Sequence, residues 1–232
     1  LMPLLVAGGG KPDTQGEGLF DSRQRALAYR SFSLVVDNIL FKRAKNVGGT
    51  FLVTSASAGE GKTTVAVSLA HHMACRGNRT LLIDANLRAP GVDAVLKLES
   101  DCALAQLLRH EAAVDDALQS SVADNLDAIT SGFTDASLFD PLWLRELQPL
   151  LPDFQKRYDI VLLDSPSVET YVDSLILSPL VDGVILTVRA DRSRREHLLS
   201  AKAKIEEAGG TILGVVLNRH HNPIPSLIQR GL

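Results

Sequence analysis

The sequence predicts one α/β domain of three layers, in which helices cover both faces of a mostly parallel central sheet. Short apolar runs, many of them β-branched, alternate along the chain with segments of helical periodicity, as is typical of a buried parallel sheet. The run at residues 51–53 leads through a turn of small residues into a helical segment. Two other runs each end on an aspartate, where the strands of such a sheet present ligand-binding side chains.

Composition sets the outer limits of this prediction. A chain of 232 residues can hold one large domain, and nothing in it requires a division. Residues 1–18 have the Gly-rich composition of a flexible linker, so we place the folded domain at residues 19–232. A net charge of −3 argues against nucleic acid as the main partner. The two cysteines lack metal or redox spacing and are interpreted as buried thiols in a reducing compartment.

The predicted elements follow one another in order along the chain. Apolar residues near helical spacing predict a first helix at 22–45. Strands are predicted at 51–53, 80–83, 125–129, 160–163, 184–188 and 212–217. Helices are predicted between them, at 65–75, 103–110, 114–119, 140–151 and 194–208. Asp140 followed by Pro141 favours a helix start, and Gly209-Gly210 favours a helix end.

The turn after the first predicted strand has the features of a phosphate-binding loop. Its sequence, Ala56-Ser-Ala-Gly-Glu-Gly-Lys-Thr, matches the pattern G-x-x-x-x-G-K-[ST] except for alanine at the first glycine. A strand, loop and helix in this order point backbone N–H groups and a positive helix terminus at a polyphosphate, which disfavours the alternative of a turn that binds nothing. The residues expected to bind the nucleotide here are Ala58, Gly59, Glu60, Gly61, Lys62, Thr63 and Thr64.

Two aspartates complete the predicted site. Asp84 follows the strand Thr80-Leu-Leu-Ile and Asp164 follows the strand Ile160-Val-Leu-Leu, so both carboxylates are expected at the sheet edge that carries the loop. Either one alone could be a turn residue, but together with Gly-Lys-Thr they favour a metal–nucleotide site. We predict that Lys62, Asp84 and Asp164 are catalytic, and that Thr63, Asp84 and Asp164 hold the Mg²⁺ of bound ATP or ADP.

With these motifs in place, the chain from about Asp37 onward resembles the bacterial tyrosine kinases of capsule and exopolysaccharide synthesis, a branch of the MinD/ParA-like P-loop NTPases. The matching segments are a Walker A-like loop at 57–64, a second acidic motif at 81–90, a Walker B-like strand at 160–167, and two late strands at 181–190 and 213–219. The resemblance implies that Asn218 recognises adenine and that Arg219 packs near it. The alternative for Asn218 is a turn residue at a strand end.

The resemblance also implies partners and a location. It implies a membrane-anchored polysaccharide co-polymerase that governs chain length as partner, and it allows a homo-oligomer. The expected location is cytoplasmic, at the inner face of the cell membrane, reached through that partner or through a transmembrane segment outside this sequence. The sequence has no apolar run of about eighteen residues that would itself span a membrane.

Three departures from the family pattern are visible. Asn86 stands where a second acidic residue is usual, and an amide can neither add negative charge to a Mg²⁺ shell nor take a proton. The charged positions of the family's N-terminal E-x-x-R-x-x-R motif are occupied here by Arg30, Ser33 and Val36. The C-terminal tyrosine cluster has no counterpart, because the tyrosines are Tyr29, Tyr158 and Tyr171.

These observations leave three functional hypotheses. The first is transfer of the γ-phosphoryl group of Mg·ATP to a tyrosine hydroxyl, with Asp84 receiving the proton. The second, motivated by Asn86, is a nucleotide-dependent switch that reports to a membrane partner. The third is a partitioning-type ATPase, which is disfavoured because Ser57 stands where that branch carries an extra lysine. Tyr171 is interpreted as a packing or surface residue rather than a phosphoacceptor, and Asp173 as a support of the site loop.

Overall fold

The computed structural model describes residues 4–8, 30–39, 49–99, 102–132 and 140–220. Residues 30–39 are helical, in agreement with part of the first predicted helix, and the rest of that prediction lies outside the described residues. Tyr29 and most of the predicted N-terminal linker also lie outside them.

The strands form one eight-stranded sheet in the order β1-β8-β7-β2-β6-β3-β5-β4. Every neighbouring pair is parallel except β4 and β5, which confirms the mostly parallel sheet. The strands are β1 Leu4–Gly8, β2 Gly49–Ser55, β3 Thr80–Asp84, β4 Gln119–Ala123, β5 Leu126–Ile129, β6 Ile160–Asp164, β7 Gly183–Arg189 and β8 Ile212–His220. The strand that leads into the phosphate-binding loop, β2, therefore lies inside the sheet between β7 and β6.

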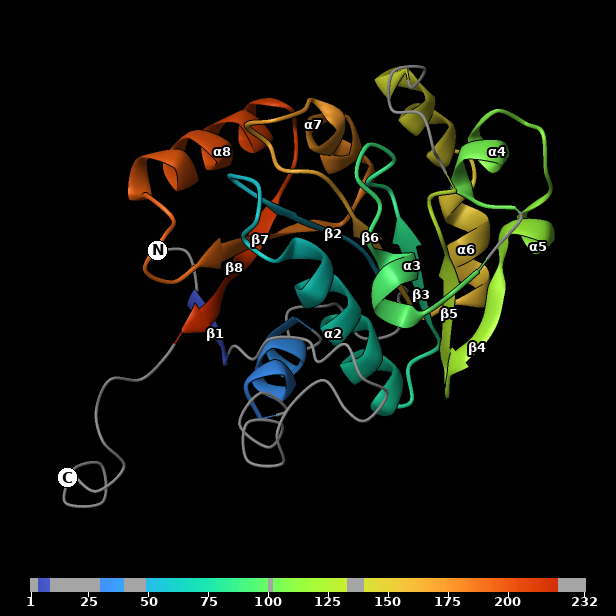
Figure 1. The fold of residues 1–232 in the computed structure, drawn as a ribbon, viewed down its shortest axis with the longest axis horizontal. Coiled ribbons are helices and arrows are strands. Elements are labelled where there is room, and N and C mark those ends of the chain that lie inside the picture. The colour runs from blue at the N-terminus through green and yellow to red at the C-terminus, as the bar shows by residue number, and fades with distance from the viewer. Residues whose placement is uncertain (1–3, 9–29, 40–48, 100–101, 133–139, 221–232) are drawn as a thin grey trace.

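Helices cover both faces of this sheet. They are α2 Lys62–Cys75, α3 Val92–Leu96, α4 Leu104–Leu108, α5 Val114–Ala117, α6 Leu151–Arg157, α7 Asp173–Leu177 and α8 Arg195–Glu207, with 3-10 turns η2 Pro141–Leu147 and η3 Ser178–Leu180. In Figure 1, α2 and the helical residues 30–39 lie on one side of the sheet, while α7 and α8 lie on the other. The three-layer αβα architecture is confirmed.

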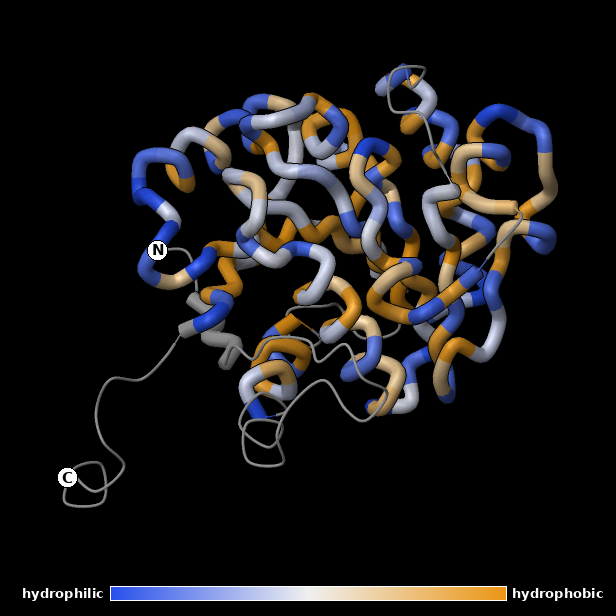
Figure 2. Tube along the Cα trace, in the orientation of Figure 1, coloured by the Kyte–Doolittle hydropathy of each residue, from blue (hydrophilic) through white to orange (hydrophobic). Residues whose placement is uncertain are grey.

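Each face of the sheet has its own hydrophobic core. Along β2, Leu52 packs in the core beneath α4, α6 and α8, whereas Phe51 and Val53 pack in the core beneath α2. This alternation follows from the two-residue repeat of a strand, whose successive side chains point to opposite faces. Figure 2 shows hydrophobic segments through the middle of the molecule and hydrophilic ones around its outline. The packing of these buried strands fixes the positions of the carboxyl ends of β2, β3 and β6 relative to one another.

Strand β1 was not predicted, and it corrects the assignment of residues 1–18 as a linker. Its residues run parallel to β8, with Leu4 opposite Val215 and Val6 opposite Leu217. The linker interpretation therefore fails for residues 4–8. The glycine run that suggested a linker begins at Gly8, the last residue of this strand, and the partner strand is far along the chain, so no local pattern marked the pairing.

Two predicted helices end or divide earlier than expected. The helix predicted at 114–119 ends at Ala117, and the chain turns into the edge strand β4. The helix predicted at 140–151 is two elements, η2 and α6, with Pro152 in the first turn of α6. Proline has no N–H to continue a preceding helix, which accounts for the break. The predicted cap at the start is confirmed, because the Asp140 carboxylate accepts a hydrogen bond from the Leu142 N–H at 2.9 Å.

Two surface properties complete the description. Cys75 is exposed at the end of α2, with its Sγ atom 3.6 Å from His71 Nε2, so the interpretation of this residue as a buried thiol is wrong. Within the described parts of the chain, no helix has the length and apolar character needed to cross a membrane.

Candidate active site

The phosphate-binding loop joins the end of β2 at Ser55 to the start of α2 at Lys62. Gly59 and Gly61 have φ angles of 78° and 90°, in the left-handed region where a side chain is unfavourable. Among the described residues, no side chain caps the first turn of α2. The N–H groups of that turn are therefore open to an anionic ligand, as the sequence predicts.

Gly61 also meets the end of β8. A Cβ atom at Gly61 would lie 2.2 Å from the Asn218 Nδ2 atom, whereas a Cβ at Gly77, at the other end of α2, would have no neighbour within 4 Å. Gly77 has φ of 80°, so the two glycines share the same backbone strain on substitution. Alanine substitutions at these two glycines therefore separate the effect of backbone strain from the effect of contact with Asn218.

We expect Gly77→Ala to lower the free energy of unfolding by about 1–2 kcal/mol, the cost of a left-handed alanine, and Gly61→Ala to lower it further, because it also displaces the buried Asn218 amide. Only Gly61→Ala should also weaken ATP binding, by about tenfold or more, because it displaces Asn218 from the loop. Denaturant unfolding and calorimetric titration of both variants measure the two effects. Equal losses of ATP affinity would contradict the importance of the contact.

The two predicted aspartates lie side by side. Asp84 of β3 is opposite Asp164 of β6 in the parallel register, and neither side chain is exposed to solvent. Asp164 is in turn opposite Val53 of β2, two residues before the loop begins. The prediction that both carboxylates reach the sheet edge carrying the loop is confirmed.

Asp164 has the surroundings expected of a cation ligand. Neither of its carboxylate oxygens accepts a regular hydrogen bond from the described residues. Burial, with the charge of Asp84 as a further cause, raises the pKa of Asp164 to about 8, while the nearby Thr63 hydroxyl and Lys62 ammonium favour its ionised form. A buried carboxylate that accepts no regular hydrogen bond is costly to ionise unless a cation binds it, so Asp164 and Thr63 fit a bound Mg²⁺.

Asp84 differs from Asp164 because its oxygens are already in use. Its Oδ2 accepts the N–H groups of Gly91 and Val92, both at 3.0 Å, and its Oδ1 accepts the Asn86 N–H at 3.0 Å. Burial raises the pKa of Asp84, and these three bonds oppose that rise. The carboxylate therefore holds the start of α3, and it is less available than Asp164 as a direct metal ligand.

Lys62 and Thr63 complete the cluster at the start of α2. Burial lowers the pKa of Lys62, and the charges of Asp164 and Glu60 oppose this. Thr63 lies beside Gly91, since a Cβ at that glycine would be 3.4 Å from Thr63 Cγ2. The structure therefore brings the predicted catalytic and metal-binding residues together, with Ala58 and Gly59 at the exposed tip of the loop.

Asn218 and Arg219 lie at the end of β8, against the loop. The Asn218 amide donates to the Glu60 carbonyl oxygen at 3.0 Å, and its Oδ1 accepts the Arg219 N–H at 2.9 Å. The Asn218 side chain is buried. Its role in recognising adenine stays a prediction, while its contact with the loop is a feature that sequence reasoning missed.

Arg88 is another residue that sequence reasoning missed. It lies in the loop after β3, and its Nε donates to Asp173 Oδ2 at 3.1 Å, where Asp173 is fully buried at the start of α7. Its guanidinium also lies 4.6 Å from the centre of the Tyr171 ring, which is 38% exposed. The expected support of the site loop by Asp173 thus acts through Arg88, the arginine of the second acidic motif.

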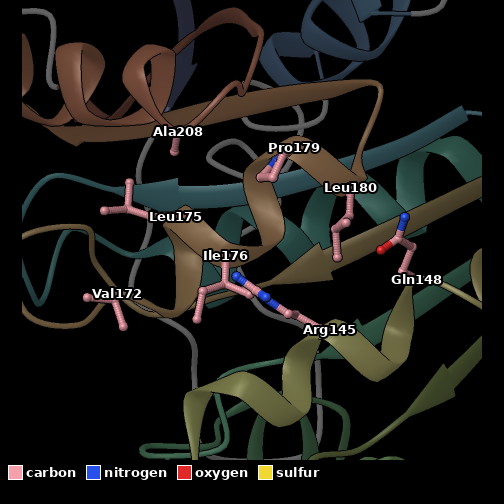
Figure 3. Close-up of a pocket in the computed structure, with 8 residues that line it drawn as sticks. All are labelled: Arg145, Gln148, Val172, Leu175, Ile176, Pro179, Leu180 and Ala208. Carbon is pink, nitrogen blue, oxygen red and sulfur yellow. The ribbon is translucent and has the colours of Figure 1, made fainter.

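A separate pocket lies between η2 and the α7–η3 segment, away from the loop (Figure 3). Its volume is about 410 Å³, and its lining is mostly apolar. It is lined by Arg145, Gln148, Val172, Leu175, Ile176, Pro179, Leu180 and Ala208. None of the predicted site residues contributes to it.

The similarity to known proteins agrees with this geometry. The sequence model of the AAA domain family matches residues 50–196. The tyrosine-protein kinase YwqD of Bacillus subtilis is 30% identical over 197 residues, which cover 84% of this chain and 82% of YwqD. The putative tyrosine-protein kinase CapB of Staphylococcus aureus is 26% identical over 188 residues, covering 81% of this chain and 82% of CapB.

Solved structures show the same fold. The chimerical protein CapA2B2 superimposes with a TM-score of 0.83 and 26% identity, over 95% of this chain and 96% of that one. The cell division ATPase MinD of Pyrococcus furiosus gives a TM-score of 0.67 and 25% identity, over 79% of this chain and 78% of that one. The chain therefore belongs to the AAA domain family and, within it, to the family of bacterial tyrosine-protein kinases.

Proposed function

We propose that this domain binds Mg·ATP and transfers the γ-phosphoryl group to a tyrosine hydroxyl, as a regulator of capsule or exopolysaccharide synthesis. The observation that carries the proposal is the buried carboxylate of Asp164, which accepts no regular hydrogen bond from the described residues and lies beside Lys62 and Thr63 at the start of an uncapped helix. Relatives named tyrosine-protein kinases, such as YwqD and CpsD of Streptococcus agalactiae, support the reaction class.

The chain's own residues position and neutralise charge. Bound Mg·ATP supplies the phosphoryl group and shields its negative charge. The N–H groups at the start of α2 hold the phosphates, and Lys62 places a cation where charge develops during transfer. Thr63 and Asp164 hold the metal. Asp84 is the proposed acceptor of the tyrosine proton, in competition with the three backbone N–H groups that its carboxylate accepts.

The proposed partner is a membrane-anchored polysaccharide co-polymerase, and a homo-oligomer is a further proposal. The domain would then work in the cytoplasm at the inner face of the membrane, held there by that partner or by a segment outside this sequence. Support comes from the resemblance of the sequence motifs to the kinases of capsule and exopolysaccharide synthesis.

A nucleotide-dependent switch is the second candidate, and Asn86 favours it. The Asn86 amide donates to the Ala89 carbonyl at 2.6 Å, and its Oδ1 accepts the Ala89 N–H at 3.3 Å. The residue that replaces the second acidic group therefore holds the loop instead of contributing charge to the site. A switch needs only different affinities of two conformations for ATP and ADP, not fast chemistry.

One incubation with Mg·ATP separates the two candidates. The readouts are anti-phosphotyrosine detection and intact mass, with a tyrosine-containing copolymer added so that an outside acceptor is always present. We expect phosphotyrosine in the wild type, and no gain in Asn86→Asp because aspartate cannot donate to Ala89. Signal that is absent in the wild type but present in Asn86→Asp would instead identify a kinase fold that has become a nucleotide sensor.

A further inference from the structure

A buried carboxylate lies inside the phosphate-binding loop. Glu60 precedes Gly61 and Lys62, yet its side chain is only 3% exposed. A fixed negative charge so close to the phosphate site opposes the binding of an anion. A carboxylate at this position therefore has a role other than attracting the phosphates. The hydrogen bonds of Glu60 show which groups it joins.

Glu60 joins two parts of the fold. Its Oε2 accepts the Ser57 N–H at 2.9 Å, which closes the first turn of the loop. Its Oε1 accepts a hydrogen bond from the Ser193 hydroxyl, in the segment between β7 and α8. Ser193 is itself fixed, because its Oγ accepts the Arg189 N–H at 2.9 Å. The loop is thus connected through one carboxylate to the end of β7.

A second carboxylate makes a parallel connection. The Ser57 hydroxyl donates to Glu169 Oε2 at 2.8 Å, and Glu169 Oε1 pairs with His197 Nδ1 on α8. Both hydrogen-bond donors of Ser57, its N–H and its hydroxyl, therefore go to carboxylates, and both carboxylates contact the chain at or just before the start of α8. Glu60 is the buried member of the two.

We propose that Glu60 is a positioning residue for nucleotide binding, which holds the phosphate-binding loop against the β7–α8 segment through Ser193. The inference rests on the proposed binding of ATP. The proposal can be distinguished from a simple effect of charge. If Glu60 acted only by its negative charge, it would weaken ATP binding; if it positions the loop, it strengthens ATP binding.

Glu60→Gln tests the two signs directly, since it removes the charge and keeps the shape. We expect the Kd for Mg·ATP to rise by about tenfold, because the neutral amide has one acceptor oxygen for the two donors of Ser57 and Ser193 and gives no charge assistance to either bond. Ser193→Ala should raise the Kd in the same direction without a change of charge. The double variant should bind no more weakly than Glu60→Gln, because both changes break one connection. Isothermal titration calorimetry measures all three.

The matched control is Glu206→Gln, which removes an exposed carboxylate of α8 that pairs with Lys202. It should leave the Kd unchanged. Binding by Glu60→Gln that is equal to or tighter than wild type, or additive losses in the double variant, would overturn the proposal. Hydrogen exchange of the Ser57 amide in nucleotide-free protein gives a second readout: it should be faster in Glu60→Gln and unchanged in Glu206→Gln. A wild type that binds no ATP would contradict the proposed function, and the amide exchange would still test the connection.

Discussion

Lys62→Ala is expected to abolish tyrosine phosphorylation while the domain stays folded. Lys62 is the cation at the start of α2, and the charges of Asp164 and Glu60 act on it. Without it, the charge that develops on the transferred group loses a fixed partner, so the rate should fall by roughly 10²–10³-fold. Burial disfavours this ammonium group, so its removal should change the free energy of unfolding by less than about 1 kcal/mol.

The measurement is the rate of phosphotyrosine formation with Mg·ATP, beside a denaturant unfolding curve. Lys202→Ala is the matched control, because Lys202 pairs only with Glu206 in a surface ion pair on α8 among the described residues. It should keep full activity. A Lys62→Ala variant that phosphorylates at the wild-type rate would exclude the loop as the phosphate site.

Asp164→Asn is expected to have two effects of opposite sign. Activity should be lost, by about 10²-fold or more, because the amide is a poorer ligand for a hard cation than a carboxylate. The nucleotide-free protein should become more stable, because a neutral amide replaces a buried carboxylate whose oxygens have no hydrogen-bond partner among the described residues. We expect a gain of roughly 1–3 kcal/mol, or about 3–8 °C in Tm.

The gain should depend on pH. In the folded protein without metal, burial raises the pKa of Asp164 to about 8, from an ordinary value of 3.8. A raised folded pKa means that the folded state holds the proton more tightly, so stability is greatest below about pH 4 and falls as the pH rises towards 8. Thermal melts with chelator at pH 5 and pH 8 should therefore differ less for Asp164→Asn than for the wild type. Asp153→Asn, an exposed carboxylate of α6, is the control.

The site was predictable because its chemistry is encoded in short segments. The loop residues are consecutive, and Asp84 and Asp164 each lie at the end of a strand that is buried on both faces of the sheet. Parallel strands bring their carboxyl ends to one edge, so the juxtaposition of the two aspartates follows from the pattern alone. The same reasoning cannot assign hydrogen bonds. Nothing local indicates that Asn86 binds Ala89 rather than facing the metal.

The connections across the fold could not be predicted for the same reason. Glu60 and Ser193 meet only because β7 lies next to β2 in the sheet. The local sequence of neither segment predicts this order of strands. Strand β1 is the extreme case, since Leu4 pairs with Val215. Secondary-structure propensity depends on the residues of one segment alone. These contacts depend on which other segment packs beside it in the folded protein.

The position of β8 has a consequence for how the protein is made. This strand lies between β7 and β1, and it supplies Asn218 to the loop, yet it is the last of the described strands to be synthesised. During synthesis on the ribosome, the strands around the loop can pair first. Strand β1 is synthesised before them, but it cannot form its pairing with β8 until β8 has been synthesised. Because contacts so distant in sequence form slowly, we expect the nascent domain to acquire its complete nucleotide loop only after β8 has emerged.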